Sequence, residues 1–164
     1  MLASEAMAKL LTHVDSHGAA HMVDIGEKPV TRRQAVAEAR VRLSSQTLRR
    51  LRAGETPKGD VLATVRLAGI QAAKRTHELI PLCHALPLTH VAIAARIGRS
   101  EVRLTATAEA EARTGVEMEA LTAATVAALT LYDMLKAIDR DITFEVMLLE
   151  KSGGASGRYR RARA

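Results

Sequence analysis

The stretch GVEMEALTAATVAALTLYDMLKAID, residues 115–139, decides the fold of this chain. Its central run, Ala120–Tyr132, carries no charged residue and predicts one long helix. Because the run is shorter than the ~20 residues that a bilayer-spanning helix needs, we interpret it as the core helix of a folded domain. Charged residues flank the run on both sides: Glu117, Glu119, Asp133 and Lys136.

Two of these charged residues are candidate site residues. Asp133 and Lys136 share one stripe of the helix with threonine, valine and alanine, where a solvated face would carry lysine and glutamate. Such a stripe is typical of a helix face that lies against protein. Burying an ion there costs free energy unless the ion is paired or takes part in binding or catalysis. The alternative is an ordinary i,i+3 ion pair on the surface near the helix end.

The spacing along the helix limits how its acidic residues can combine. Glu119 and Asp133 are fourteen residues apart, which is about 21 Å along an α-helix. This distance is too long for both carboxylates to contact one reacting centre. Either they serve opposite ends of a long ligand, or different subunits complete each site.

The rest of the chain carries alternating strand and helix patterns. Apolar residues at every second position predict strands at Val36–Leu43, Thr89–Ile97, Glu101–Arg113 and Ile142–Leu148. Ser45 as a cap and Gly54 as a stop predict a short helix, and Asp60 as a cap predicts a second helix that ends near Arg75. The segment His77–Leu88 contains two prolines and is expected to be a loop.

This order predicts an α+β fold of the ferredoxin-like, split βαβ type, with an extra helix in the first crossover. Its antiparallel sheet should carry the helices on one face. The other face is solvated or covered by a second subunit, and the alanine-rich strands favour a second subunit. We expect residues 1–22 to form an N-terminal arm, 23–152 a single catalytic domain, and 153–164 a tail rich in glycine and arginine.

The composition narrows the class of partner. The net charge of +6 over 164 residues favours an anionic partner, either nucleic acid or a phosphorylated metabolite. Two tyrosines, one phenylalanine and no tryptophan offer little for stacking bases, so we expect a small molecule rather than nucleic acid or a membrane. Cys83 is the single cysteine, and the N-terminus lacks a signal-type apolar core, which favours a cytoplasmic location.

Three further positions have functional and structural interpretations. Lys58 precedes a helix N-terminus, which suits an anionic ligand, although a solvated loop lysine has the same pattern. His84 lies beside Cys83 in an apolar loop, where it is either functional or a buried, hydrogen-bonded histidine. Adjacent residues rarely aim at each other, so we do not expect covalent catalysis by Cys83. The Lys151–Gly157 segment is either an anion-binding turn or a flexible tail.

A zinc site is a weaker hypothesis for the N-terminal arm. His13, His17 and His21 recur at every fourth residue and would share one face of a helix. Gly18 interrupts that helix, and no fourth ligand is obvious. We therefore expect no metal site.

Eight segments of the chain resemble one family in order and spacing, the molybdenum cofactor biosynthesis protein C family, whose members are cyclic pyranopterin monophosphate synthases. The segments cover nearly the whole chain. They are Thr12-His13, Ala20–Asp24, Lys58–Val61, Ala68–Thr76, Leu79–His84, Thr114–Thr122, Tyr132–Ala137 and Lys151–Gly154.

The resemblance implies a lyase of molybdenum cofactor biosynthesis. Its substrate is (8S)-3',8-cyclo-7,8-dihydroguanosine 5'-triphosphate, which rearranges to cyclic pyranopterin monophosphate with release of diphosphate. No redox cofactor is implied. The family assembles as a homohexamer, a trimer of dimers, with each pocket at a subunit interface.

The resemblance also assigns roles to residues. Asp133, Lys58 and Lys136 are expected to be catalytic, as acid and base if burial brings their pKa values toward neutrality. The leaving diphosphate is negatively charged, and we expect that charge to be neutralised by the lysines, by Arg33 or Lys74, and by the Lys151 segment. The other residues expected to bind the substrate are Leu82, Cys83, His84, Glu117, Met118 and Glu119.

The chain departs from the family pattern at three positions, which include His77 where the family usually has tryptophan and Leu135 where it can have cysteine. Ala85 stands where the family usually has proline, which predicts a looser loop around His84. A ferredoxin-like nucleic-acid-binding module would agree with the fold and the charge. A scaffold that keeps the fold without the chemistry is the third interpretation.

Overall fold

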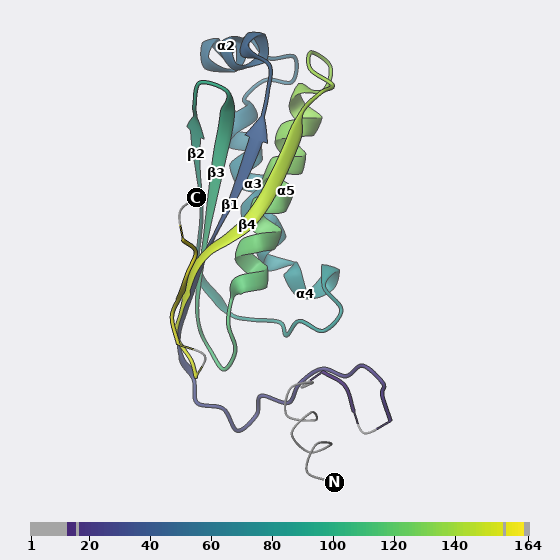
Figure 1. Cartoon of the computed structure of the whole chain (residues 1–164), viewed down its shortest axis with the longest axis vertical. Helices are drawn as coiled ribbons and strands as arrows, with labels where there is room; N and C mark the ends of the chain where they lie inside the picture. Colours follow the sequence, from purple (N-terminus) through teal and green to yellow (C-terminus); the bar gives the residue numbers. More distant parts are fainter. Residues whose placement is uncertain (1–12, 16, 156, 163–164) are drawn as a thin grey trace.

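The structure, a computed structural model, describes residues 13–15, 17–155 and 157–162, so most of the expected N-terminal arm lies outside the described residues. A long antiparallel sheet carries helices on one face (Figure 1). The strands are β1 (Thr31–Arg42), β2 (Leu88–Ile97), β3 (Glu101–Ala112), β4 (Thr143–Ser152) and β5 (Tyr159–Arg160). The helices are α2 (Ser45–Ala53), α3 (Val61–Lys74), α4 (Thr76–Leu79) and α5 (Glu117–Leu135).

The strand order confirms the predicted fold. The sheet runs β2-β3-β1-β4-β5, and every neighbouring pair is antiparallel. Its first four strands have the split βαβ arrangement, with α2 as the extra helix of the first crossover. The short strand β5 was not predicted. It pairs with the end of β4, so part of the expected tail belongs to the sheet.

Small side chains form the helix-facing side of the two central strands. Ala35 and Ala37 of β1 pair with Ala108 and Ala106 of β3, and all four are fully buried. The small side chains let α5 lie close to the sheet. β1 begins five residues before the predicted Val36, because the polar residues at its start pair with the end of β3 without an apolar pattern to reveal them.

The helix ends follow from capping residues. The Ser44 hydroxyl accepts a hydrogen bond from the Thr47 amide at 3.2 Å, so Ser44 rather than the predicted Ser45 caps α2. Gly54, with a φ of 73°, ends α2 as predicted. The Asp60 carboxylate caps α3 by accepting from the Ala63 amide at 3.0 Å. This cap fixes the turn that carries Lys58.

Helix α5 is the central element of the helical layer. It packs on α3 and on the helix-facing side of the sheet, with its alanines and Leu131 buried (Figure 1). Its length and composition would allow it to cross a membrane, but most of its apolar window is buried inside the fold. Asp133 and Lys136 form an i,i+3 ion pair in the single chain, and their side chains are about half exposed.

Replacing Gly69 with alanine should lower the free energy of unfolding by about 1–2 kcal/mol. A Cβ atom on Gly69 would lie 2.9 Å from the Ile93 side chain and 3.1 Å from the Ala123 carbonyl, so α3 would have to move away from α5 and β2. This cost exceeds the helix propensity that alanine gains. Urea denaturation measures the change. The control is Gln71→Ala on the exposed side of α3, and an equally stable Gly69→Ala would contradict the close packing.

Candidate active site

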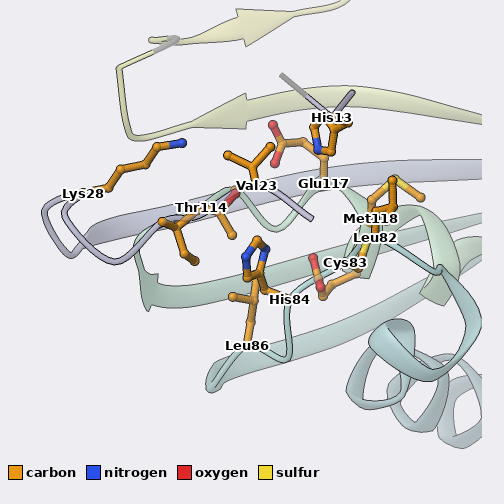
Figure 2. Close-up of a pocket in the computed structure, with 13 residues that line it drawn as sticks. His13, Val23, Lys28, Leu82, Cys83, His84, Leu86, Thr114, Glu117 and Met118 are labelled. Carbon is orange, nitrogen blue, oxygen red and sulfur yellow. The ribbon is translucent and has the colours of Figure 1, made fainter. Parts of the chain in front are cut away.

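A pocket of about 400 Å³ lies at the N-terminal end of α5. Three segments form its walls: the described residues between 13 and 30, the loop between α4 and β2, and the start of α5 (Figure 2). The first of these precedes β1 and extends the expected arm beyond residue 22, and we call it the N-terminal arm. It brings together most of the expected substrate-binding residues, namely Leu82, Cys83, His84, Glu117, Met118 and Glu119. The two motifs that contribute these residues are more than thirty positions apart in sequence, and the fold places them on one cavity.

The acidic residues Glu117 and Glu119 lie in the first turn of α5, where the helix dipole stabilises negative charge. Gly115 makes room for them, since a Cβ atom there would lie 1.8 Å from a Glu117 carboxylate oxygen. Glu117 Oε1 forms an ion pair with Lys151 Nζ at a distance of 3.3 Å. Lys151 therefore lies beside the pocket through its contact with Glu117, and it links the end of β4 to the start of α5.

Burial brings the pKa of the Glu119 carboxyl close to neutral pH. Its residue is only 4% exposed, and burial together with the nearby Glu117 carboxylate raises its pKa to about 7. Burial also raises the pKa of the Cys83 thiol, and the Glu119 charge adds to this effect. Cys83 is therefore a poor nucleophile, whereas Glu119 can both hold and release a proton.

Replacing Glu119 with glutamine should stabilise the chain above about pH 7 and remove a pH dependence. Between the ordinary pKa of 4.5 and about 7, the folded chain holds a proton that the unfolded chain has lost. Stability therefore falls as pH rises through this window. A neutral glutamine avoids the loss, on the order of 2–3 kcal/mol at pH 8. Urea denaturation at pH 5 and pH 8 measures it, with the exposed Glu111→Gln as control. Equal pH dependence in the parent and Glu119→Gln would exclude the shift.

The expected catalytic residues form a second cluster at the opposite end of α5. Lys58 Nζ lies 2.7 Å from Asp133 Oδ2, and Lys136 Nζ lies 2.7 Å from Asp133 Oδ1. One carboxylate therefore holds two ammonium groups, one from the turn before α3 and one from the end of α5. A single chain therefore brings these three side chains together.

Pairing moves the pKa values of Asp133 and Lys136 away from neutrality. Hydrogen bonds from Lys136 and Lys58 lower the pKa of Asp133 to about 2, and Asp133 in turn raises the pKa of Lys136. The condition that burial brings the pKa values toward neutrality is therefore not met by Asp133 and Lys136 in the single chain. The reason is that the side chains remain half exposed, so pairing outweighs desolvation. Asp133 acts as a permanent anion that orients two ammonium groups.

The remaining two expected residues lie outside both clusters. Arg33 is 8% exposed, and its Nε and Nη2 each donate to a backbone carbonyl at 3.3 Å, those of Ala112 and Arg113. A Cβ atom on Gly154 would lie 1.6 Å from Arg33 Nη1, so the turn after β4 packs directly on the guanidinium. Lys74 lines a neighbouring cavity of about 400 Å³.

Several residues that line the pocket were not predicted to do so. They are His13, Val23, Ile25, Lys28, Leu86, Thr114 and Gly115. Most lie in or next to segments that carry the family resemblance, which is the signal that could have found them. Lys28 had no such signal, because a lone lysine in a polar loop has no pattern.

The described residues contain no group of three or more histidine, cysteine or acidic side chains placed to share a metal ion. The zinc hypothesis for the arm required a helix. In the described part of the arm, Val14 instead pairs with Ala20 across a turn, and the His21 amide donates to the His13 carbonyl at 3.0 Å. His13 points toward the pocket, near Glu117 (Figure 2).

The two clusters cannot meet around one centre within a single chain. Helix α5 carries Glu119 at its start and Asp133 near its end, and about 21 Å of helix separates them. The pocket is lined by the acidic Glu117 and Glu119 together with Lys28, whereas the distant cluster pairs one carboxylate with two ammonium groups.

Comparison with known proteins shows which family the chain is similar to. Three relatives are each named cyclic pyranopterin monophosphate synthase. The Herpetosiphon aurantiacus protein is 59% identical over 153 residues, which cover 92% of this chain and 93% of the relative. The Roseiflexus protein is 58% identical over 152 residues, covering 91% and 96%, and the Thermomicrobium roseum protein is 57% identical over 154 residues, covering 92% and 93%. The model of the MoaC family matches residues 22–154, and the chain belongs to this family.

Proposed function

We propose that this chain is a cyclic pyranopterin monophosphate synthase in the cytoplasm. It converts (8S)-3',8-cyclo-7,8-dihydroguanosine 5'-triphosphate to cyclic pyranopterin monophosphate and diphosphate. The single observation that carries the proposal is the match along nearly the whole chain to relatives of that name. The reaction needs no oxidant or reductant, since it rearranges the purine-derived ring and closes a cyclic phosphate as diphosphate leaves.

The pocket at the start of α5 receives the pterin-forming half of the substrate. Glu119, with its pKa near 7, accepts and returns protons as the ring opens and the pyran ring forms. His84 and Glu117 hold the guanidine-like edge of the base from opposite walls of the cavity. The apolar residues Leu82 and Met118 limit the entry of water to the reacting ring.

The second cluster acts on the charged half of the substrate. Lys58 and Lys136 stabilise negative charge and donate protons where diphosphate departs, and Asp133 holds both of them in place. Lys151, beside Glu117, adds positive charge at the pocket end. Arg33 fixes the turn that follows Lys151, and Lys74 contributes its charge from the neighbouring cavity.

Each active site combines two protomers. The pocket of one protomer faces the Lys58, Asp133 and Lys136 cluster of another, in a homohexamer built as a trimer of dimers. Two observations support this arrangement: the length of α5 keeps the clusters apart within one chain, and the second cluster is half exposed. Covering that cluster with the pocket of a second protomer would desolvate it and strengthen its hold on the phosphates.

The test is conversion of the cyclised triphosphate by the purified protein, with chromatographic detection of the pterin and colorimetric detection of diphosphate. The proposal requires both products in equal amounts. Well-folded protein that forms neither would favour the non-catalytic scaffold. Tight, steeply salt-dependent binding to single-stranded RNA, without binding to nucleoside triphosphates, would favour the nucleic-acid-binding alternative.

A further inference from the structure

The N-terminal arm forms one wall of the pocket although it is not part of the sheet or the helical layer. Val23, Ile25 and Lys28 all line the cavity, and Lys28 reaches it from the arm side (Figure 2). Among the described residues from 13 to 30, only Val23 and Ile25 are half-buried, and the others are exposed. Apolar burial therefore contributes little to holding this wall in place.

A local turn shapes the part of the arm that carries Lys28. The Asp24 carboxylate accepts a hydrogen bond from the Gly26 amide at 2.8 Å, and the Lys28 amide donates to the Ile25 carbonyl at 3.0 Å. These bonds close the turn on itself. They do not attach it to the rest of the molecule.

The attachment comes from Arg113, at the end of β3. Its Nη1 donates to the Gly26 carbonyl at 2.7 Å and also to the Lys28 carbonyl. Its own carbonyl accepts from Arg33 Nη2 at 3.3 Å, so the backbone of Arg113 is fixed from the sheet side. The next two residues in the chain, Thr114 and Gly115, line the same pocket from the segment between β3 and α5. Arg113 thus joins two walls of one cavity.

We propose that Arg113 is a positioning residue, which docks the 24–28 turn on the end of β3 and so places the Lys28 ammonium at the rim of the pocket. There the ammonium meets the anionic part of the ligand. The expected effect on substrate binding rests on the function proposed above. The docking of the turn by Arg113 does not depend on that function. Arg113 acts through Lys28 and not by touching the ligand.

Hydrogen exchange tests the docking without any assay of activity. In Arg113→Ala, the amides of residues 22–30 should exchange about 10-fold faster, because two charge-assisted hydrogen bonds are lost, while β1 and β3 keep their protection. The matched control is Arg32→Ala. Arg32 is an exposed arginine that pairs with Glu109 on the open face of the sheet, and its removal should leave the arm unchanged. Unchanged exchange of residues 22–30 in Arg113→Ala would overturn the proposal.

Steady-state kinetics test whether docking of the turn by Arg113 affects substrate binding. Arg113→Ala should raise KM for the cyclised triphosphate about 10-fold and change kcat by less than about 2-fold. Arg113→Lys, which keeps the charge and can still donate to the carbonyls, should restore most of the affinity. Lys28→Ala should raise KM by a similar factor, and the double variant should be no worse than Lys28→Ala alone.

The double variant separates positioning from direct contact. If the two effects on KM multiply, Arg113 contacts the ligand independently and the positioning role is wrong. If the parent protein turns over no substrate, the proposed function fails, and the exchange measurement alone decides whether Arg113 docks the arm.

Discussion

Asp133→Asn should lower turnover by ~10²–10⁴-fold and leave the fold intact. Asparagine has nearly the same shape, but it cannot carry the charge that holds Lys58 and Lys136 at 2.7 Å each. Without that anion the two ammonium groups repel each other and leave the position in which they stabilise the departing diphosphate. Lys58→Ala should cause a loss of similar size, since it removes one of the two ammonium groups. Single-turnover rates with the cyclised triphosphate measure both variants.

A neighbouring carboxylate gives the matched control. Asp141 is exposed just beyond the C-terminal end of α5, and Asp141→Asn removes the same charge without touching Lys58 or Lys136. It should keep the rate of the parent. Circular dichroism and size-exclusion chromatography must show that the Asp133 and Lys58 variants remain folded and assembled. Near-normal turnover in either variant would remove that residue from the mechanism.

A mixture of two inactive variants should regain activity when each variant carries its defect in a different half of the site. Asp133→Asn keeps an intact pocket, and His84→Ala keeps an intact Lys58 and Asp133 cluster. If each site takes its pocket from one protomer and its cluster from another, random exchange at a 1:1 ratio makes about a quarter of the sites fully intact. The mixture should therefore reach about a quarter of the activity of the parent protein.

The control mixture combines two defects in the same half. Lys58 and Asp133 contact each other within one chain, so every site formed from Lys58→Ala and Asp133→Asn has a damaged cluster. This mixture should remain inactive. Mass spectrometry of differently labelled variants verifies that subunits exchange. Verified exchange with no recovery in the Asp133→Asn and His84→Ala mixture would show that each site belongs to one chain.

The local patterns of the sequence predicted most of the fold because the relevant signals act over short distances. The Asp60 cap, the Gly54 stop and the alternating residues of the β2–β3 hairpin each depend on a few neighbouring residues. The start of β1 was missed because its polar residues gain their strand partners from β3, more than seventy positions later. β5 was missed for the same reason, since only its pairing with β4 makes it a strand.

The sequence predicted some contacts of the candidate site and not others. The difference depends on whether a contact lies within one helix or joins distant segments. Asp133 and Lys136 lie three positions apart on one helix, so the helical period alone places them together. The contact between Lys58 and Asp133 joins α5 to the turn before α3, and the family resemblance rather than any periodicity indicated it. The Arg113 side chain donates to the backbone carbonyl of Lys28, and a backbone carbonyl can accept a hydrogen bond whichever side chain its residue carries. A contact of that kind leaves no pattern in the sequence.

The pKa values were the least predictable feature because they depend on burial as well as on neighbours. Glu119 and Asp133 are both acidic residues of α5 with charged neighbours. Burial raises the pKa of Glu119 to about 7, whereas two ammonium groups at a half-exposed position lower that of Asp133 to about 2. The Glu119 carboxyl can therefore exchange a proton near neutral pH, whereas the Asp133 carboxylate stays charged and pairs with two lysines.

A crystal structure of the assembled protein with the cyclised triphosphate, trapped in Asp133→Asn, tests the shared site most directly. The account predicts that the ring of the ligand lies beside His84 and Glu119 of one protomer, while its phosphates reach Lys58 and Lys136 of a neighbouring protomer. A ligand held entirely by one chain, with every Lys58 in the assembly remote from its phosphates, would contradict it.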